Sequence, residues 1–129
     1  MGAVVTSTVA GAPRGVAILG STGSIGTTAL RVLSRQMDLF RVAALTAFSN
    51  AALLAEQATR FKPTFVGLVE HGPEHPKHPH WRVGPQCLVE AARRDDVDIV
   101  LNAVVGAAGL QATLAALAAG KRVALANKE

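Results

Sequence analysis

The chain has 129 residues, of which 50% are apolar and only 4% are aromatic. A chain of this length forms one domain and buries about two-thirds of its unfolded surface. The formal charge is +4 and the pI is about 10.0. Because the Lys and Arg residues are scattered and not interleaved with aromatic residues, this charge favours an anionic small molecule over nucleic acid.

Several features suggest a reducing compartment and no membrane. The single cysteine, Cys87, excludes an internal disulfide and is expected to be a small packed residue. No apolar stretch approaches the roughly twenty residues of a membrane span. Residues 1–14 lack the basic start and long apolar centre of a signal peptide, and we expect a flexible tail there. We therefore expect a cytoplasmic protein with neither a membrane nor a nucleic-acid partner.

Apolar runs alternate with helical patterns from residue 15 onward. Residues 15–20, GVAILG, predict a strand that is buried on both faces. Ser24 is expected to cap a helix that extends to about Gln36, with its inner stripe formed by Ile25, Ala29, Leu30, Val32 and Leu33. A second strand is predicted from Arg41.

The same alternation continues to the end of the chain. Ser49 or Asn50 is expected to cap a helix over 51–61, a third strand covers 64–69, and a third helix covers 85–94. A fourth strand over 97–105, a helix closed by Gly120 and a fifth strand over 121–126 complete the pattern. Five strands alternating with helices predict an α/β fold with a parallel sheet and right-handed crossovers.

The segment ILGSTGSIGTTAL, residues 18–30, is the strongest candidate for a binding site. A loop from a strand into a helix surrounds one point with free N–H groups and the positive end of the helix dipole, which suits phosphate. Gly20 would allow the turn, Gly23 the approach of a phosphate oxygen and Gly26 close packing, while Ser21, Thr22 and Ser24 add hydroxyl groups. A glycine turn without a ligand remains the alternative.

The end of the second predicted strand bears on which dinucleotide is bound. NAD-binding domains place an acidic residue there for the ribose 2′-hydroxyl. This chain has Phe48, Ser49 and Asn50 there, and no acid before Glu56, which favours NADP with Ser49 and Asn50 as neutral donors. Arg60 is the first basic residue that follows. Asn50 is equally well explained as a helix cap.

Two long blocks, ILGSTGSIG and LNAVVGAAGLQATLAALAAGKRVALANKE, together resemble the amino-terminal NADPH-binding domain of the 1-deoxy-D-xylulose 5-phosphate reductoisomerase family. The resemblance extends from about Gly15 to Glu129. It implies a Rossmann-like, doubly wound sheet with helices on both faces over 15–129. It also implies that a catalytic domain and a carboxyl-terminal domain are absent from this chain, which is expected to be a truncated protein.

The resemblance also implies roles for individual residues. Thr22, Gly23, Ser24 and Ile25, with Gly20, would line the NADPH pyrophosphate, and 48–50 would face the adenosine. This chain departs from family members that carry a glycine and a basic residue where Phe48 and Ser49 stand. In the closing NKE motif, Asn127 and Glu129 match cofactor contacts and Lys128 matches a substrate contact, in line with the ability of an ammonium group to stabilise negative charge.

The implied activity is that of an NADPH-dependent oxidoreductase of isoprenoid biosynthesis. It converts 1-deoxy-D-xylulose 5-phosphate to 2-C-methyl-D-erythritol 4-phosphate with Mg or Mn, as a homodimer. The metal-binding carboxylates would lie beyond the NKE motif, so no metal ligand or catalytic residue is expected in this chain, and the chain alone is expected to be inactive. Two alternatives stay open: another NADP-dependent oxidoreductase, of the aspartate-semialdehyde or dihydrodipicolinate type, and a non-catalytic nucleotide-binding module complete at Glu129.

The segment 70–81, EHGPEHPKHPHW, contains four histidines. Histidine-rich tracts bind zinc or nickel in some proteins, but three prolines prevent a helix from aligning these imidazoles. We expect a solvated loop that Trp81 packs onto the domain.

Overall fold

The computed structural model describes residues 13–72, 78 and 80–126. In chain order its elements are β1 (Arg14–Leu19), α1 (Ser24–Leu33), β2 (Phe40–Ala47), α2 (Ala51–Phe61), β3 (Phe65–Leu68), β4 (Arg82–Val83), α3 (Cys87–Ala92), β5 (Ile99–Asn102), α4 (Gly106–Ala118) and β6 (Arg122–Leu125). The predicted alternation of strands and helices is confirmed.

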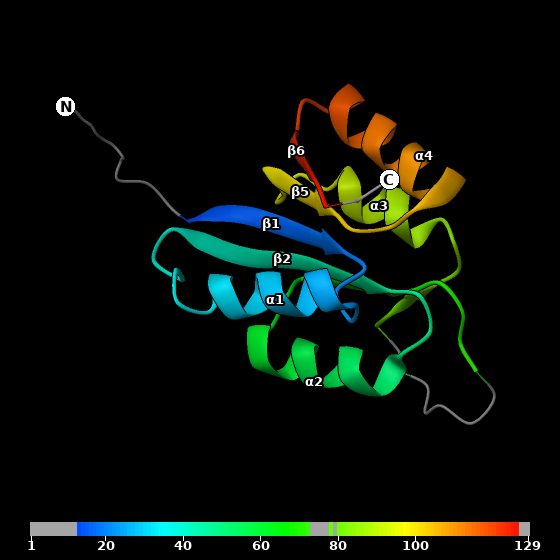
Figure 1. Cartoon of the computed structure of the whole chain (residues 1–129), viewed down its shortest axis with the longest axis horizontal. Helices are drawn as coiled ribbons and strands as arrows, with labels where there is room; N and C mark the ends of the chain where they lie inside the picture. The colour runs from blue at the N-terminus through cyan, green and yellow to red at the C-terminus, as the bar shows by residue number, and fades with distance from the viewer. Residues whose placement is uncertain (1–12, 73–77, 79, 127–129) are drawn as a thin grey trace.

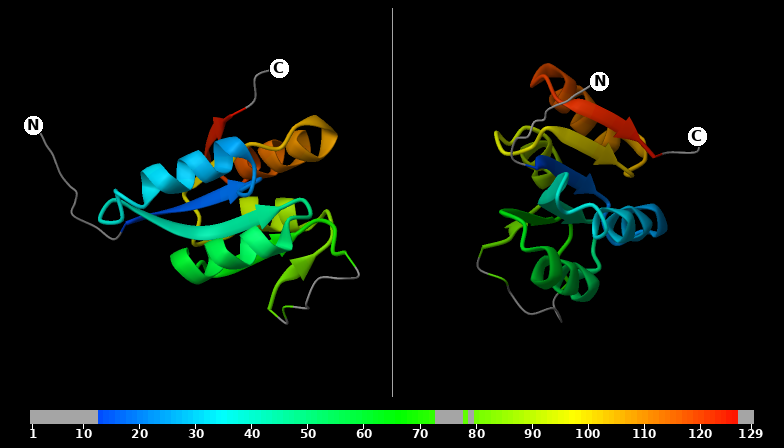
Figure 2. Two further views of the ribbon diagram at one scale, coloured as in Figure 1. Left: turned by 60° about the horizontal axis from the view of Figure 1, so that its bottom comes forward. Right: turned by 90° about the vertical axis from the view of Figure 1, so that its left-hand side faces the viewer.

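The strands form one parallel sheet in the order β4-β3-β2-β1-β5-β6. Helices α1 and α2 cover one face, and α3 and α4 cover the other (Figures 1 and 2). The strand order reverses between β1 and β5, so the sheet is doubly wound and Rossmann-like, as predicted. The prediction of five strands missed β4, a two-residue strand that exists only through its pairing with β3.

Alternate residues of the strands supply two cores. Val16, Ile18 and Leu45 pack with α1 and α2, whereas Ala17 and Leu19 pack with α3 and α4. Cys87 is fully buried on the second side, where burial, with a contribution from Glu90, raises the pKa of its thiol to about 11. The prediction that Cys87 is a packed residue is confirmed.

Two details of α1 differ from the prediction. The helix ends at Leu33 rather than near Gln36, and its N-cap is Gly23 rather than Ser24. Of the predicted inner stripe, Leu30 is buried, but Ile25 and Val32 are 38% and 57% exposed. The pattern 29–33 contains more apolar residues than one helix face can bury, so part of it faces outward.

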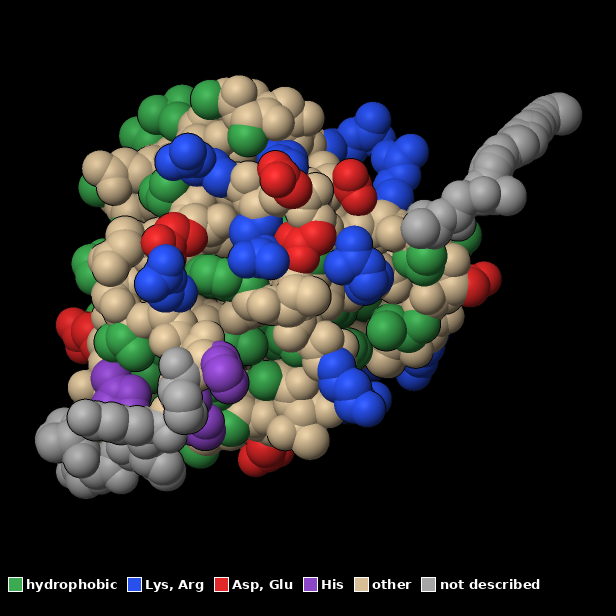
Figure 3. All heavy atoms as spheres, turned by 180° about the vertical axis from the view of Figure 1, so that it is seen from behind, with side chains coloured by type: hydrophobic (Ala, Val, Ile, Leu, Met, Phe, Trp, Pro, Cys, Tyr) green, Lys and Arg blue, Asp and Glu red, His purple; other side chains and the backbone are tan. Residues whose placement is uncertain are grey.

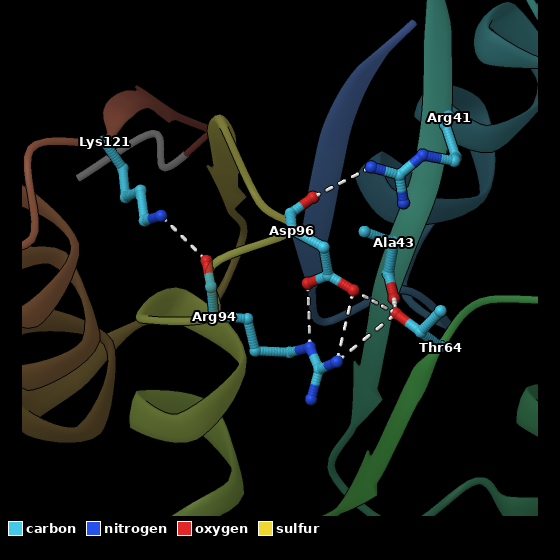
Figure 4. A network of polar contacts seen from close by, with 6 residues as sticks. All are labelled: Arg41, Ala43, Thr64, Arg94, Asp96 and Lys121. Carbon is cyan, nitrogen blue, oxygen red and sulfur yellow. Dashed lines mark hydrogen bonds and ion pairs between the residues drawn. The ribbon is translucent and has the colours of Figure 1, made fainter. Parts of the chain in front are cut away.

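Polar groups at the amino-terminal edge of the sheet bind one another (Figure 4). The carboxylate of Asp96 accepts hydrogen bonds from the Arg94 guanidinium at 2.9 and 3.1 Å and from the Thr64 hydroxyl. Arg41 donates to the Asp96 carbonyl oxygen at 3.1 Å, and Lys121 donates to the Arg94 carbonyl oxygen at 2.7 Å. The Arg94 hydrogen bonds hold the pKa of Asp96 below its usual value. Polar groups at this end of the sheet thus satisfy one another's hydrogen bonds.

Basic and acidic side chains are mixed on one face of the molecule (Figure 3). The described residues form two ion pairs, Arg82–Glu90 and Arg94–Asp96. In the loop before β4, the rings of His78 and Trp81 stack 3.8 Å apart, and Trp81 is partly buried against the α1/α2 core, as expected for a residue that anchors this loop. Within the described ranges, no helix is long and apolar enough to cross a membrane.

Candidate functional site

The glycine loop lies where the strand order reverses, at the carboxyl end of β1. The N–H groups of Gly20 and Ser21 both donate to the Thr46 carbonyl oxygen of β2, at 3.0 and 2.8 Å. These bonds attach the loop to the neighbouring strand before α1 begins. In doubly wound sheets, ligands bind outside the carboxyl ends of the strands at this position.

The structure gives a different account of the glycine at each of the three positions. Gly20 has φ +86°, a conformation that favours glycine. A Cβ on Gly26 would lie 2.3 Å from the Gly20 carbonyl oxygen and 2.6 Å from Ser21 Cα, so only glycine lets α1 pack this closely. At Gly23 the nearest atom to a Cβ is 3.7 Å away, and φ is −76°. The fold therefore does not require glycine at position 23. A ligand that approaches the backbone at this position would require it.

The first turn of α1 has backbone N–H groups that bond no described residue. No side chain caps the helix, and no acidic residue lies in its first turn. No described residue accepts a hydrogen bond from the N–H groups of Ser24, Ile25 or Gly26, while Thr27 N–H bonds the Gly23 carbonyl at 2.9 Å. Because Ser24 is the first helical residue rather than the cap, its hydroxyl group does not occupy these donors.

Ser21 does not belong to the rim of this loop. Its side chain is fully buried and donates to Gln57 Oε1 of α2 at 2.7 Å, and Gln57 Nε2 donates to the Ser21 carbonyl at 2.9 Å. The expectation that Ser21 adds a hydroxyl group to the phosphate site is wrong, since the side chain instead fastens the loop to α2. Thr22 is half-buried, and Gly23, Ser24 and Ile25 are exposed on the open side of the loop.

Ser49 and Asn50 follow β2, the strand beside the loop, and both are exposed. Asn50 is the N-cap of α2, and its Oδ1 accepts the Leu53 N–H at 3.1 Å. Its predicted role as a cap is confirmed. The Asn50 carbonyl and side chain thus serve α2, whereas α1 has no comparable cap.

A second uncapped helix starts at the same end of the sheet, on its other face. The sequence predicts this helix, but its place beside the site was missed. α4 starts at Gly106 after the end of β5, with no side-chain cap and no acid in its first turn. A Cβ on Gly109 would lie 2.0 Å from the Val104 carbonyl oxygen. The buried Asn102 fixes this turn, because Nδ2 donates to the Gly109 carbonyl at 2.8 Å and Oδ1 accepts the Val104 N–H at 3.0 Å. The sequence feature that could have indicated this turn is the pair Gly106 and Gly109 after a strand, which has the same spacing as Gly23 and Gly26.

The NKE residues Asn127, Lys128 and Glu129 lie outside the described residues. The chain reaches them along the same edge of the sheet, since Ala126 N–H donates to the Asn102 carbonyl at 3.0 Å. The structure thus brings the glycine loop, the β2–α2 connection and the β5–α4 turn to one edge.

The sequence model of the protein family 1-deoxy-D-xylulose 5-phosphate reductoisomerase matches residues 16–129. The chain belongs to the 1-deoxy-D-xylulose 5-phosphate reductoisomerase family. It is 44% identical to the reductoisomerase of Oleidesulfovibrio alaskensis over 125 residues, covering 91% of this chain and 31% of that protein. It is also 44% identical to the chloroplastic reductoisomerase of Oryza sativa over 126 residues, covering 91% of this chain and 27% of that protein.

Solved structures of reductoisomerases have the same fold. The enzyme of Zymomonas mobilis in complex with NADPH gives a TM-score of 0.78 at 39% identity, covering 90% of this chain and 32% of that one. A reductoisomerase in complex with NADPH, fosmidomycin and magnesium gives 0.77 at 37% identity, covering 90% and 30%. The chain thus spans about three-tenths of the length of its relatives, and the resemblance to this family is confirmed.

Proposed function

We propose that this chain is the NADPH-binding part of a 1-deoxy-D-xylulose 5-phosphate reductoisomerase. The observation that carries the proposal is the uncapped first turn of α1, with an open space at Gly23 and N–H groups at Ser24 and Ile25 that bond no described residue. These donors and the helix dipole fit a pyrophosphate. The relatives solved with NADPH support the same ligand.

We assign roles in NADPH binding to the other residues at the carboxyl ends of the strands. Gly20 and Gly23 leave room for the pyrophosphate, and the hydroxyl groups of Thr22 and Ser24 add donors beside it. Ile25, exposed in the first turn, gives the dinucleotide an apolar contact. Ser49 and Asn50 face the adenosine end, where Asn50 Nδ2, which bonds no described residue, is a donor.

In the NKE motif, we propose that Asn127 and Glu129 contact the cofactor and that Lys128 contacts the substrate. NADPH, when bound, supplies a hydride for the reduction of an aldehyde formed by rearrangement of the sugar phosphate skeleton. An ammonium group such as that of Lys128 stabilises negative charge on the substrate oxygens.

The full-length protein is proposed to be a cytoplasmic homodimer that converts 1-deoxy-D-xylulose 5-phosphate to 2-C-methyl-D-erythritol 4-phosphate with Mg or Mn and without a nucleic-acid or membrane partner. Among the described residues no group of three or more His, Cys, Asp or Glu is placed to hold a metal ion. The family resemblance implies that the metal ligands lie in the part of the relatives that this chain does not span, so the chain alone is expected to show no turnover.

The proposal is tested by titrating the folded chain with NADPH and following nicotinamide fluorescence. Ser24→Asp places a carboxylate in the first turn of α1, which favours the helix dipole but repels phosphate. Gln36→Glu, beyond the far end of α1, is the charge-matched control. We expect Ser24→Asp to weaken binding at least tenfold and the control to leave it unchanged. Equal affinity of both variants, or no binding by the wild-type chain, would overturn the proposal.

A further inference from the structure

The backbone of the glycine loop is held from two neighbouring elements. The N–H groups of Gly20 and Ser21 donate to the Thr46 carbonyl oxygen of β2, at 3.0 and 2.8 Å. The next peptide group along the loop joins Ser21 to Thr22, and its carbonyl oxygen accepts a hydrogen bond from Gln57 Nε2 of α2 at 2.9 Å. Among the described residues, Gln57 has the only side chain that bonds the backbone of residues 20–23.

Gln57 is held in one orientation. It is only 7% exposed, on the helix that lies beside α1 (Figures 1 and 2). Its Oε1 accepts the Ser21 hydroxyl at 2.7 Å, and since a carbonyl oxygen only accepts, Nε2 is the atom that faces the Ser21 carbonyl. A leucine would fill a similar volume without polar groups that need partners. The amide therefore contributes its two hydrogen bonds to the loop rather than packing alone.

The bond from Gln57 fixes the direction of the Thr22 N–H group. A trans peptide group is planar, and its C=O and N–H point in opposite directions. Because the Ser21 carbonyl points to α2, the Thr22 N–H points away from α2. No described residue accepts a hydrogen bond from this N–H, and Thr22 is half-buried beside the exposed Gly23. Thr22 N–H is thus a further backbone donor for the proposed pyrophosphate.

We propose that Gln57 is a positioning residue for the dinucleotide, which holds the Ser21–Thr22 peptide group with its N–H toward the pyrophosphate. The inference rests on the proposed dinucleotide site and concerns how its loop is held. Gln57 lies behind the loop and acts through it. Without the Nε2 bond this peptide group is free to rotate, and a rotated group presents a carbonyl oxygen instead of a donor to the phosphate.

The experiment compares two substitutions that remove different hydrogen bonds of this pair. Gln57→Leu removes both bonds at nearly the same side-chain volume. Ser21→Ala is the matched control, because it removes only the hydroxyl bond and leaves Gln57 Nε2 on the Ser21 carbonyl. Each variant leaves a buried polar group without its partner, so both should lower the Tm. Calorimetric titration well below both Tm values should show NADPH affinity reduced at least about tenfold in Gln57→Leu and less than about threefold in Ser21→Ala.

A second ligand separates positioning from a general loss of stability. Adenosine 2′-monophosphate lacks the pyrophosphate and tests the adenosine end alone. Gln57→Leu should bind it within about twofold of the wild-type affinity, a difference from NADPH that a destabilised fold would not produce. Gln57→Met, with an unbranched apolar side chain, is a second variant with the same expectations. Circular dichroism verifies that each variant folds.

Unchanged NADPH affinity of Gln57→Leu or Gln57→Met would overturn the inference while leaving the proposed function intact. Equal losses of NADPH affinity in Ser21→Ala and Gln57→Leu would also overturn it, because affinity would then follow stability. An equal loss for NADPH and adenosine 2′-monophosphate in Gln57→Leu would do the same. Absence of NADPH binding by the folded wild-type chain would instead overturn the proposed function, and the inference with it.

Discussion

Two glycines three residues apart are expected to respond to the same substitution in opposite ways. Gly26→Ala places a Cβ 2.3 Å from the Gly20 carbonyl oxygen and within 2.8 Å of two Ser21 backbone atoms. Because these are backbone atoms, α1 has to move away from the loop. Overpacking of this kind costs about 1–3 kcal/mol, against about 1 kcal/mol gained by alanine in a helix.

The short contact places Gly26→Ala at the upper end of that range, with a net loss of about 2 kcal/mol in the free energy of unfolding. For a domain of this size, this loss lowers the Tm by about 6–8 °C. Gly23→Ala should change stability by less than about 1 kcal/mol, because φ is −76° and the nearest atom to the new Cβ is 3.7 Å away. The added methyl group instead occupies the space proposed for a phosphate oxygen, so NADPH affinity should fall about tenfold.

Thermal unfolding followed by circular dichroism and calorimetric titration with NADPH separate the two effects. The expected result is a stable Gly23→Ala chain that binds poorly and a destabilised Gly26→Ala chain. A Gly26→Ala chain as stable as the wild type would refute the packing argument. Unchanged NADPH affinity of Gly23→Ala would refute the claim that Gly23 is kept free for a ligand.

Predictions for three further residues concern stability, its pH dependence and thiol reactivity. Asn102→Ala leaves buried polar groups of the β5–α4 turn unpaired and should cost about 2–3 kcal/mol in urea unfolding. Asp96 has a lowered pKa through its bonds with Arg94, so its stabilising contribution is present above about pH 4 and is lost as pH falls through the folded pKa. Asp96→Asn should therefore flatten the decline of Tm below about pH 4. Cys87, buried with a pKa of about 11, should not react with a disulfide reagent at pH 8 until denaturant is added.

The regular part of this fold could be predicted because its signals are local. The apolar runs, the Asn50 cap and the glycine at 20 each report on a strand, a helix start or a turn within a few residues. The roles expected for Gly20 and Gly26, a turn and a close approach, are those that the structure shows. Local pattern therefore located the edge of the sheet on which the site is built.

Apart from the bounds and the exposed residues of α1, the errors concern interactions between segments distant in sequence. Ser21 looked like a rim hydroxyl because nothing near it in sequence shows that Gln57, 36 residues away, binds it. β4 has two residues and is defined only by its partner β3. These tertiary contacts determine which side chains of a predicted loop remain available to a ligand.

The β1–α1 loop and the β5–α4 turn have the same arrangement. In each, a strand end is followed by a turn and an uncapped helix, and a glycine in the first turn lies against a backbone carbonyl: Gly26 against Gly20 and Gly109 against Val104. β1 and β5 are adjacent, so both helix starts flank the point where the strand order reverses, from opposite faces. A Cβ at either glycine would displace one helix start from that point. Close packing at Gly26 and Gly109 therefore holds both helix starts at the point where the proposed dinucleotide would bind.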